Sequence, residues 1–123
     1  MAASTPLVLV YAGCSTCKRA LRWFADRGIA VDVRAIVDEP PSIKELAHWI
    51  PTSGRSIRKW LNTSGQSHRA LGKPKVDAAS DDELMTWLAR DGKLVKRPVV
   101  VTAERVLVGF DESTYATTFE RPR

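Results

Sequence analysis

The sequence predicts an α/β protein in which helices cover a mixed β-sheet. Three features predict this class: a strand, a helix and a strand open the chain, several helices fill its middle, and two β-branched strands joined by a short turn come near its end. A strand–helix–strand unit pairs its strands in parallel, whereas a hairpin adds an antiparallel pair. Helices then pack on the sheet and bury its apolar faces around one core.

The first three elements follow from the hydropathy pattern. The continuous apolar run at residues 7–11 is typical of a buried strand. Apolar residues then recur at helical spacing over residues 16–27, and Gly28 stands where a helix can end. Apolar and polar residues alternate over residues 29–37, which predicts a second strand with Val33 on its apolar face.

A helix is expected to begin after Ser42. Ser42 and Glu45 have the spacing of a capping box, in which each side chain accepts a hydrogen bond from the backbone N–H of the other residue. Apolar residues recur at helical spacing from Ile43 to Ile50, which places Ile43 on the apolar face. Pro51 is expected to close this helix, because proline lacks the N–H that a helix interior needs.

Three more helical segments are expected before the hairpin. Residues 56–61 and 67–71 have short apolar patterns at helical spacing, and the Lys-Pro-Lys run at 73–75 is expected to end the second segment. Ser80 and Glu83 form a second capping box, which starts a longer helix that Asp-Gly ends.

The end of the chain predicts a hairpin and a last helix. Residues 99–101 and 106–108 are β-branched and apolar, and residues 102–105 are available for the turn. Asp111 can cap the helix that follows, with Tyr115 facing inward.

Length and composition agree with one domain over residues 1–123, with a helical insertion at about 42–92. The chain is 44% hydrophobic and 27% charged, as in ordinary globular proteins, which excludes a disordered chain. No apolar run approaches the roughly 20 residues of a membrane-spanning helix, and the first is too short for a signal peptide. We therefore expect a cytoplasmic monomer that does not bind a membrane.

The net charge of +5 is concentrated in the middle of the chain. Residues 42–75 contain seven Lys and Arg and one acidic residue, a net +6. Such a block favours an anionic ligand or an acidic partner, although a solvated helical face has the same composition. The four tryptophans are scattered without a base-stacking motif, so direct nucleic-acid binding is not expected.

Cys14 and Cys17 stand where the first strand meets the first helix, and a C-x-x-C pair in this place predicts thiol redox chemistry. A helix start offers free N–H groups and the positive end of the helix dipole, which stabilise a thiolate. Lys18 and Arg19 add positive charge nearby. Cys14, nearest the free amides, is the candidate nucleophile. Cys17, one turn further on, is the candidate resolving thiol, since a small adjustment brings the pair to disulfide distance.

Two other interpretations of the cysteines remain open from the residues alone. Cys17 also falls on the inner face of the helix, where an inert core thiol is common. A zinc site is the second alternative, but it needs four ligands. Only His48 and His68 remain as further donors, and their spacing is not that of a zinc motif. No metal is therefore expected.

Seven segments together resemble the arsenate reductase / Spx family, a branch of the thioredoxin-like proteins, over nearly the whole chain. They are YAGCSTCKRA at 11–20, SIRKWLNTSG at 56–65, RALG at 69–72, SDDEL at 80–84, DG at 91–92, KRP at 96–98 and VGFDE at 108–112. The resemblance implies a thioredoxin-like fold with β-α-β, an inserted helical block and β-β-α. It also implies a cis peptide bond before Pro98 that faces the cysteines; proline is tolerated there, at the start of a strand.

The resemblance implies roles for individual residues. In the arsenate-reducing branch, Cys14 matches the nucleophile. Arg58 and Arg97 match arginines that hold the oxyanion and its thiol adduct, and Arg97 is expected near Cys14 if the bond before Pro98 is cis. Ser15 and Thr16, between the cysteines, complete the expected substrate-binding set.

Two positions depart from the arsenate-reducing pattern. A third arginine of that branch falls at about Gly109, so one cationic contact is missing here. Enzymes of the branch also commonly carry only the first cysteine and take the second thiol from glutathione, whereas this chain has Cys17. Both features, together with residues 108–112, look more like the Spx/MgsR regulators. There a Cys14–Cys17 disulfide is a redox switch, and its output is binding to the RNA polymerase α subunit.

Two functions are therefore compared. The first is a thiol-dependent reductase resembling the glutaredoxin-type arsenate reductases, with glutathione and glutaredoxin, or thioredoxin, as reductant and no tightly bound cofactor. The second is an Spx/MgsR-like redox-sensing regulator. A thiol oxidoreductase of another substrate is the third and least specific interpretation. The arginines give the first function a mechanism, and it is the one we favour.

Overall fold

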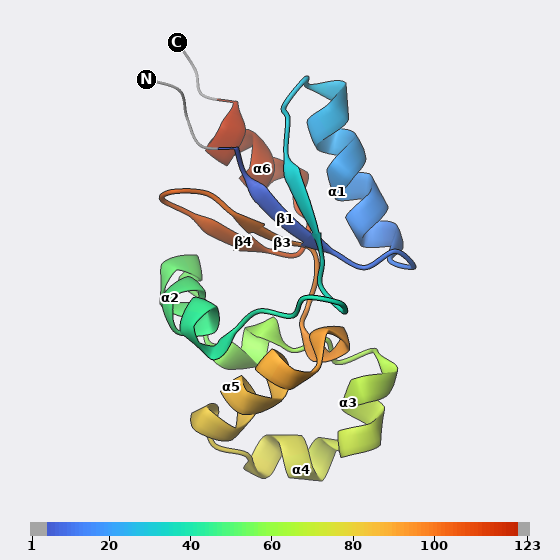
Figure 1. Ribbon diagram of the computed structural model, residues 1–123, viewed down its shortest axis with the longest axis vertical. Helices are drawn as coiled ribbons and strands as arrows, with labels where there is room; N and C mark the ends of the chain where they lie inside the picture. Colours follow the sequence, from blue (N-terminus) through green and yellow to red (C-terminus); the bar gives the residue numbers. More distant parts are fainter. Residues whose placement is uncertain (1–4, 121–123) are drawn as a thin grey trace.

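The computed structural model describes residues 5–120 and contains one mixed sheet with helices on both of its faces (Figure 1). The strands are β1 (Leu7–Val10), β2 (Asp32–Ala35), β3 (Val99–Val101) and β4 (Val106–Val108), in the order β2-β1-β3-β4. β1 pairs in parallel with β2 and antiparallel with β3, and β3 pairs antiparallel with β4. The predicted α/β class with a mixed sheet is confirmed.

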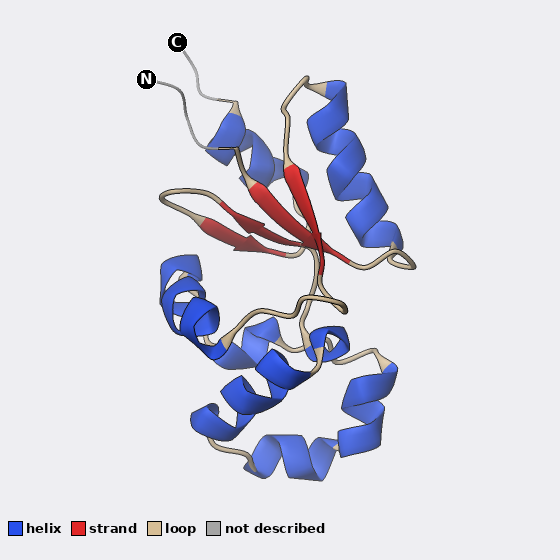
Figure 2. Cartoon of the chain, viewed as in Figure 1, coloured by secondary structure: helices blue, strands red, loops and turns tan. Residues whose placement is uncertain are grey.

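The helices divide into two groups. The α-helices are α1 (Ser15–Asp26), α2 (Ile43–Ser53), α3 (Gln66–Leu71), α4 (Lys73–Ala78), α5 (Asp81–Arg90) and α6 (Glu112–Phe119), and the 3₁₀ helices are η1 (Ile57–Trp60) and η2 (Gly92–Leu94). Figure 2 shows α1 and α6 on one side of the sheet and the remaining helices on the other, with α3 and α4 furthest away. Within the described residues, every helix is too short or too polar to cross a membrane.

Strand alternation separates two apolar cores. On one face, Val8 and Val100 pack with the aromatic cluster of α1 and α6, which includes Phe24 and Tyr115. On the other face, neighbouring residues such as Leu9 pack against the inserted helices. Because successive residues of a strand point to opposite faces, one short sheet serves both cores.

The second strand is shorter than predicted, and its apolar face is not buried. Val33 pairs with Val8 and shares its face, yet its side chain is 56% exposed. Val33 is exposed because β2 is an edge strand of the sheet and the helices leave this side chain partly uncovered. Ile36, just beyond the strand, is the fully buried residue of this segment.

The expectations for α2 are confirmed at its start and wrong at its end. The capping box between Ser42 and Glu45 is present. Ile43 is 52% exposed, so it does not belong to the buried face. Pro51 lies inside the helix, which continues to Ser53 and ends at Gly54 with φ +72°. Proline removes one backbone donor and crowds the turn before it, and the helix continues for only two residues beyond it.

The expected helix at 67–71 is present and ends before the Lys-Pro-Lys run, but this run, which contains Pro74, also begins a further helix that was not predicted. α3 ends at Leu71, Gly72 turns the chain with φ +88°, and α4 starts at Lys73 with the proline in its first turn. The first N–H groups of a helix have no partner within it, so proline loses nothing there. The capping box of Ser80 and Glu83 and the cap of Asp111 on α6 are both confirmed.

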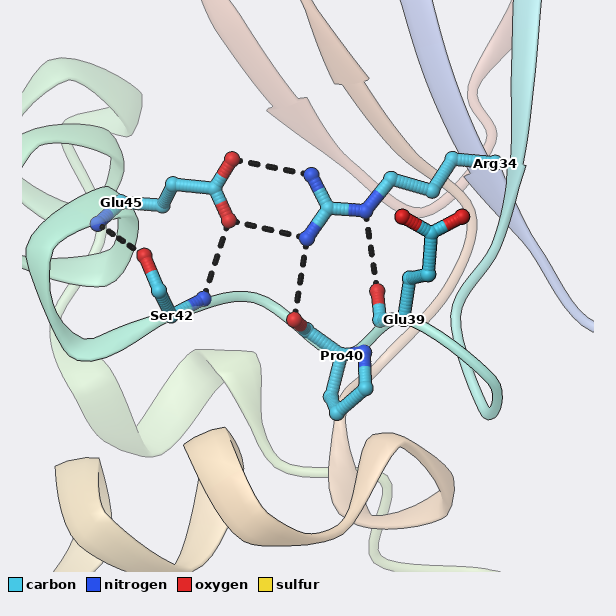
Figure 3. A network of polar contacts seen from close by, with 5 residues as sticks. All are labelled: Arg34, Glu39, Pro40, Ser42 and Glu45. Carbon is cyan, nitrogen blue, oxygen red and sulfur yellow. Dashed lines mark hydrogen bonds and ion pairs between the residues drawn. The ribbon is translucent and has the colours of Figure 1, made fainter.

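A charged network ties the end of β2 to α2 (Figure 3). Arg34 donates from Nη1 and Nη2 to the two carboxylate oxygens of Glu45, each at 2.9 Å, and from Nε and Nη2 to the carbonyls of Glu39 and Pro40. The hydrogen bond from Arg34 holds the pKa of Glu45 below its ordinary value. The bidentate pair thus fixes the chain where it leaves the sheet for the insertion.

Close contacts also fix residues 92–96, which lead from the insertion back to the sheet. A side chain at Gly92 would place its Cβ 1.9 Å from the carbonyl oxygen of Ile36, so only glycine fits. Leu61 and Val95 form an isolated antiparallel bridge, and the Lys96 N–H donates to a carbonyl of η1 at 2.7 Å. These contacts set the position of the residues that precede β3.

Candidate active site

Cys14 is the N-cap residue of α1. Its backbone is extended, and its Sγ accepts a hydrogen bond from the Cys17 backbone N–H at 3.2 Å. The Cys14 N–H donates to the Tyr11 carbonyl at 3.0 Å, so a tight turn carries the chain from β1 to the helix start. A sulfur in this place makes the capping contact that a serine or aspartate oxygen usually makes.

The two thiols ionise very differently. Partial burial opposes ionisation of Cys14, but hydrogen bonds from Cys17 and the positive charge of Arg97 outweigh it and hold the pKa of Cys14 below its ordinary value. Burial and the hydrogen bond to Cys14 raise the pKa of Cys17 to about 12. Cys17 is only 1% exposed, whereas Cys14 borders a cleft. The pair therefore favours a thiolate at Cys14 and a protonated thiol at Cys17.

Arg97 is anchored on one side of its guanidinium only. Its Nη1 donates to the carbonyls of Lys93 at 3.1 Å and Val95 at 3.4 Å, and its Cζ lies 4.6 Å from the centroid of the Tyr11 ring. Nε is buried, and no residue in the range 5–120 accepts its hydrogen bond. Nη2 has no hydrogen-bond partner among the described residues and is not buried, so it keeps its capacity to donate to an anion.

Cys14 and Arg97 line the same cleft, which has a volume of about 690 Å³. Its wall is formed by Gly13, Cys14, Ser15, Thr16, Arg19, Arg55, Asn62, Ser64, Gly65, Lys96, Arg97, Val108, Gly109, Phe110 and Asp111. Four of these side chains are cationic and one is a carboxylate, Asp111, whose pKa is lowered by a hydrogen bond from Thr114. The cleft therefore offers a nucleophilic sulfur in positive surroundings, an arrangement that suits an anionic substrate.

Most of the expected site residues lie together. Ser15 and Thr16 line the cleft beside Cys14, and Cys17 lies directly below the nucleophile candidate. The Arg97–Pro98 peptide bond is cis, the conformation expected from the resemblance. The first turn of α1 and the residues before β3 thus form two walls of one site.

Arg58 lies elsewhere and is not part of the cleft wall. Its Nη1 donates to the Val76 carbonyl at 3.1 Å and its Nη2 to the Ala79 carbonyl at 2.6 Å. These carbonyls belong to the C-terminal end of α4, which lacks intrahelical partners and carries the negative end of the helix dipole. Arg58 thus caps a helix of the insertion, and the structure does not bring it to the cleft that Cys14 borders; its role in substrate binding stays a prediction.

Two further cleft residues, Arg55 and Lys96, were not singled out from the sequence. Arg55 follows Gly54 and Lys96 precedes Arg97, whereas Arg19, expected from the sequence to add positive charge near the cysteines, also lines the cleft. Arg55 belongs to the basic block at residues 42–75, but nothing in the composition of that block separates it from its neighbours. Only the path of the loop brings it to the cysteines.

The two histidines do not approach the cysteines. His48 is exposed on α2, and His68 lies on α3. Neither lines the cleft, and over residues 5–120 no three His, Cys, Asp or Glu side chains gather as metal ligands would.

Comparison with known protein families identifies the family of this chain. The ArsC family model matches residues 9–118. The chain belongs to the ArsC family. YusI of Bacillus subtilis, an uncharacterized protein, is 39% identical over 106 residues, which cover 85% of this chain and 90% of YusI. An arsenate reductase of Escherichia coli is 32% identical over 89 residues, which cover 72% of this chain and 62% of that protein.

Solved structures agree with this assignment. An ArsC family related protein from Bacteroides fragilis is 41% identical with a TM-score of 0.89, and the match covers 94% of this chain and 98% of that one. A possible arsenate reductase from Streptococcus mutans is 36% identical with a TM-score of 0.84, covering 94% and 99%. The thioredoxin-like fold expected from the resemblance is thus confirmed.

Proposed function

We propose that this chain is a thiol-dependent reductase of oxyanions, with arsenate as its first candidate substrate. One observation carries the proposal: Cys14, whose pKa is lowered by hydrogen bonds and by Arg97 against the opposing effect of burial, borders a cleft with four cationic side chains. A tetrahedral anion fits the positive wall, and the thiolate is a nucleophile suited to attack it.

In the first step the Cys14 thiolate attacks the central atom of the oxyanion. A sulfur–arsenic bond forms, and one oxygen leaves as water after protonation. The guanidinium of Arg97 donates a hydrogen bond to one of the remaining oxygens through Nη2, the group that the described residues leave unpaired and accessible. No electrons reach arsenic in this step, because arsenic stays in its +5 state in the adduct.

In the second step Cys17 attacks the sulfur of Cys14. A Cys14–Cys17 disulfide forms, the sulfur–arsenic bond breaks, and its electron pair remains on arsenic, which leaves as arsenite. Because the Cys14 Sγ accepts a hydrogen bond from the Cys17 backbone N–H at 3.2 Å, the two cysteines are neighbours at the helix start. The negative charge of Cys14 contributes to the raised pKa of Cys17, so formation of the adduct removes one obstacle to deprotonating the resolving thiol.

The disulfide is then reduced by two external thiols, which are themselves oxidised to a disulfide. Glutathione with glutaredoxin, or thioredoxin, belongs to the class of reductant required. The cleft gives such a thiol access to Cys14, whereas the buried Cys17 is shielded from it. Attack on the Cys14 sulfur therefore releases the Cys17 thiolate first.

The test is arsenate turnover by the purified protein with glutathione, glutaredoxin and a coupled glutathione reductase. Cys14→Ser is expected to abolish turnover. Cys17→Ser is the matched control: it keeps the nucleophile and forces resolution by glutathione, so a Cys14–glutathione mixed disulfide accumulates and mass spectrometry detects it. Absence of turnover with arsenate in the wild-type protein, under both glutaredoxin and thioredoxin, contradicts the proposal.

The neighbouring cysteines also support a second candidate, a redox-sensing regulator. Global transcriptional regulator Spx of Streptococcus agalactiae is 23% identical over 99 residues, 80% of this chain and 72% of that protein. In this candidate the Cys14–Cys17 disulfide changes binding to the RNA polymerase α subunit. A pull-down with the oxidised protein, the reduced protein and the Cys14→Ser/Cys17→Ser variant tests it. Equal retention of the α subunit by all three, or none by any, removes this function.

A further inference from the structure

Lys96 is a cation of the cleft for which residues 5–120 supply no partner. The guanidinium of Arg19 lies 5.7 Å from the ring centroid of Phe110, and that of Arg97 lies over Tyr11. For the charged groups of Arg55 and Lys96, the residues described supply no hydrogen bond, ion pair or aromatic face. Of these two cations, Lys96 directly precedes Arg97, the residue proposed to hold the oxyanion.

The backbone that carries Lys96 is held in place. Its N–H donates to the Trp60 carbonyl at 2.7 Å, directly beside the bridge between Leu61 and Val95. The fold already fixes the backbone that carries this side chain. Binding of a ligand therefore loses conformational entropy only at the ammonium end.

The side chain of Lys96 packs against Gly109. The Cε of Lys96 lies 3.6 Å from the position that a Cβ would take on Gly109, so the methylene arm lies against this residue. Gly109 has φ +84°, its N–H donates to the Pro98 carbonyl at 2.8 Å, and its carbonyl accepts from the Tyr115 hydroxyl at 2.8 Å. A longer side chain at this position would compete with the lysine for the same space.

We infer that the ammonium group of Lys96 binds the oxyanion together with Arg97. This inference rests on the proposed function and adds the second cation of the substrate site. Arg97 contributes its accessible Nη2 group, and Lys96 contributes a compact charge with three donors, so the two can contact different oxygens of one tetrahedral dianion. Lys96 thereby brings positive charge to the place where Gly109 has no side chain of its own.

The experiment measures protection of Cys14 from alkylation. Iodoacetamide modifies Cys14 in the reduced protein, and mass spectrometry follows the modified peptide while inorganic sulfate is added at constant ionic strength. Sulfate is a tetrahedral dianion that the thiolate does not reduce. For each protein, the rate of Cys14 alkylation is divided by the rate measured without sulfate. The readout is the sulfate concentration at which this rate falls to one half.

Lys96→Gln is expected to raise that concentration about tenfold, the effect of losing one charge-assisted contact. Lys96→Arg, which keeps the charge, is expected to stay within about threefold of the wild type. Lys44→Gln, which removes an exposed lysine outside the cleft, is the matched control and is expected to leave the value unchanged.

Two results overturn the inference, and they are distinguishable. If sulfate protects the wild type and Lys96→Gln equally, Lys96 does not bind the anion, while the proposed function stands. If sulfate and arsenate both fail to protect Cys14 in the wild type, the cleft does not bind oxyanions and the proposed function fails with it.

Discussion

The loop before β3 and the end of α4 each hold an arginine through two backbone carbonyls, yet the two arginines are left with different capacities. Arg58 uses both Nη groups on the carbonyls of Val76 and Ala79. Arg97 uses only Nη1 for its carbonyl contacts, and its buried Nε has no partner within residues 5–120. The first guanidinium completes a helix end, whereas the second keeps its Nη2 group for a ligand.

This difference teaches how an arginine becomes available for binding. Both side chains carry the same charge, and both were assigned to the oxyanion from the resemblance. The number of donors that the backbone consumes separates them, together with the cleft that Arg97 lines and Arg58 does not. The charge of Arg97 also lowers the pKa of Cys14, an effect that the structure assigns to no other arginine.

The largest expected effect comes from the support beneath Arg97. Gly92→Ala places a Cβ 1.9 Å from the Ile36 carbonyl oxygen, so η2 must move, and its residue Lys93 supplies a carbonyl to Arg97. We expect the free energy of unfolding to fall by about 3 kcal/mol, together with a loss of turnover. Urea denaturation measures the first. A variant as stable as the wild type would show that the close packing at Gly92 does not hold this loop.

The next effect separates the two arginines by turnover. Arg97→Lys keeps the charge but removes the planar fork, and we expect kcat/KM for arsenate to fall about 50-fold, the loss of one to two charge-assisted contacts. The steady-state assay with glutathione and glutaredoxin measures it. Arg58→Lys is the matched control and is expected to stay within about twofold. Equal losses of kcat/KM in the two variants would contradict the different roles assigned to Arg97 and Arg58.

A smaller effect separates them by stability. Arg58→Gln removes the two donors from the end of α4, and we expect the free energy of unfolding to fall by about 1 kcal/mol, because the side chain is exposed and water partly replaces it. Thermal and urea unfolding measure the change, and turnover is expected to remain. A Gln variant that loses turnover while keeping its stability would return Arg58 to the substrate site.

The smallest effect concerns the pH dependence of Cys14. The thiolate reacts, so the rate of alkylation rises with pH and its midpoint is expected below 9.0, the ordinary value, because the pKa of Cys14 is lowered. Arg97→Gln removes one of the causes that lower this pKa, so its midpoint moves to higher pH. Arg58→Gln is expected to leave the midpoint in place. Identical profiles for the wild type and Arg97→Gln would exclude an electrostatic role of Arg97.

Local signals in the sequence predicted well what local interactions decide. The capping boxes at Ser42 and Ser80 fix helix starts through contacts within four residues, and both are present. Pro51 was misjudged, and the helix that starts at Lys73, with Pro74 in its first turn, was missed, because the effect of a proline depends on its position in the helix, and helix bounds are set by packing as well as by sequence. Val33 alternates like a buried strand residue, but its place at the sheet edge leaves it exposed.

The sequence by itself determined the mixed sheet, the helical insertion and a C-x-x-C pair at a helix start, because hydropathy period, caps and turn residues act over short distances along the chain. Only the tertiary structure decided which cations meet the cysteines. Arg97 lies more than 80 positions from Cys14 in the sequence and reaches it through the pairing of β1 with β3, whereas Arg58 is drawn to the end of α4. Charges act through space, so their effect on the Cys14 thiol is set by the fold and not by their order in the chain.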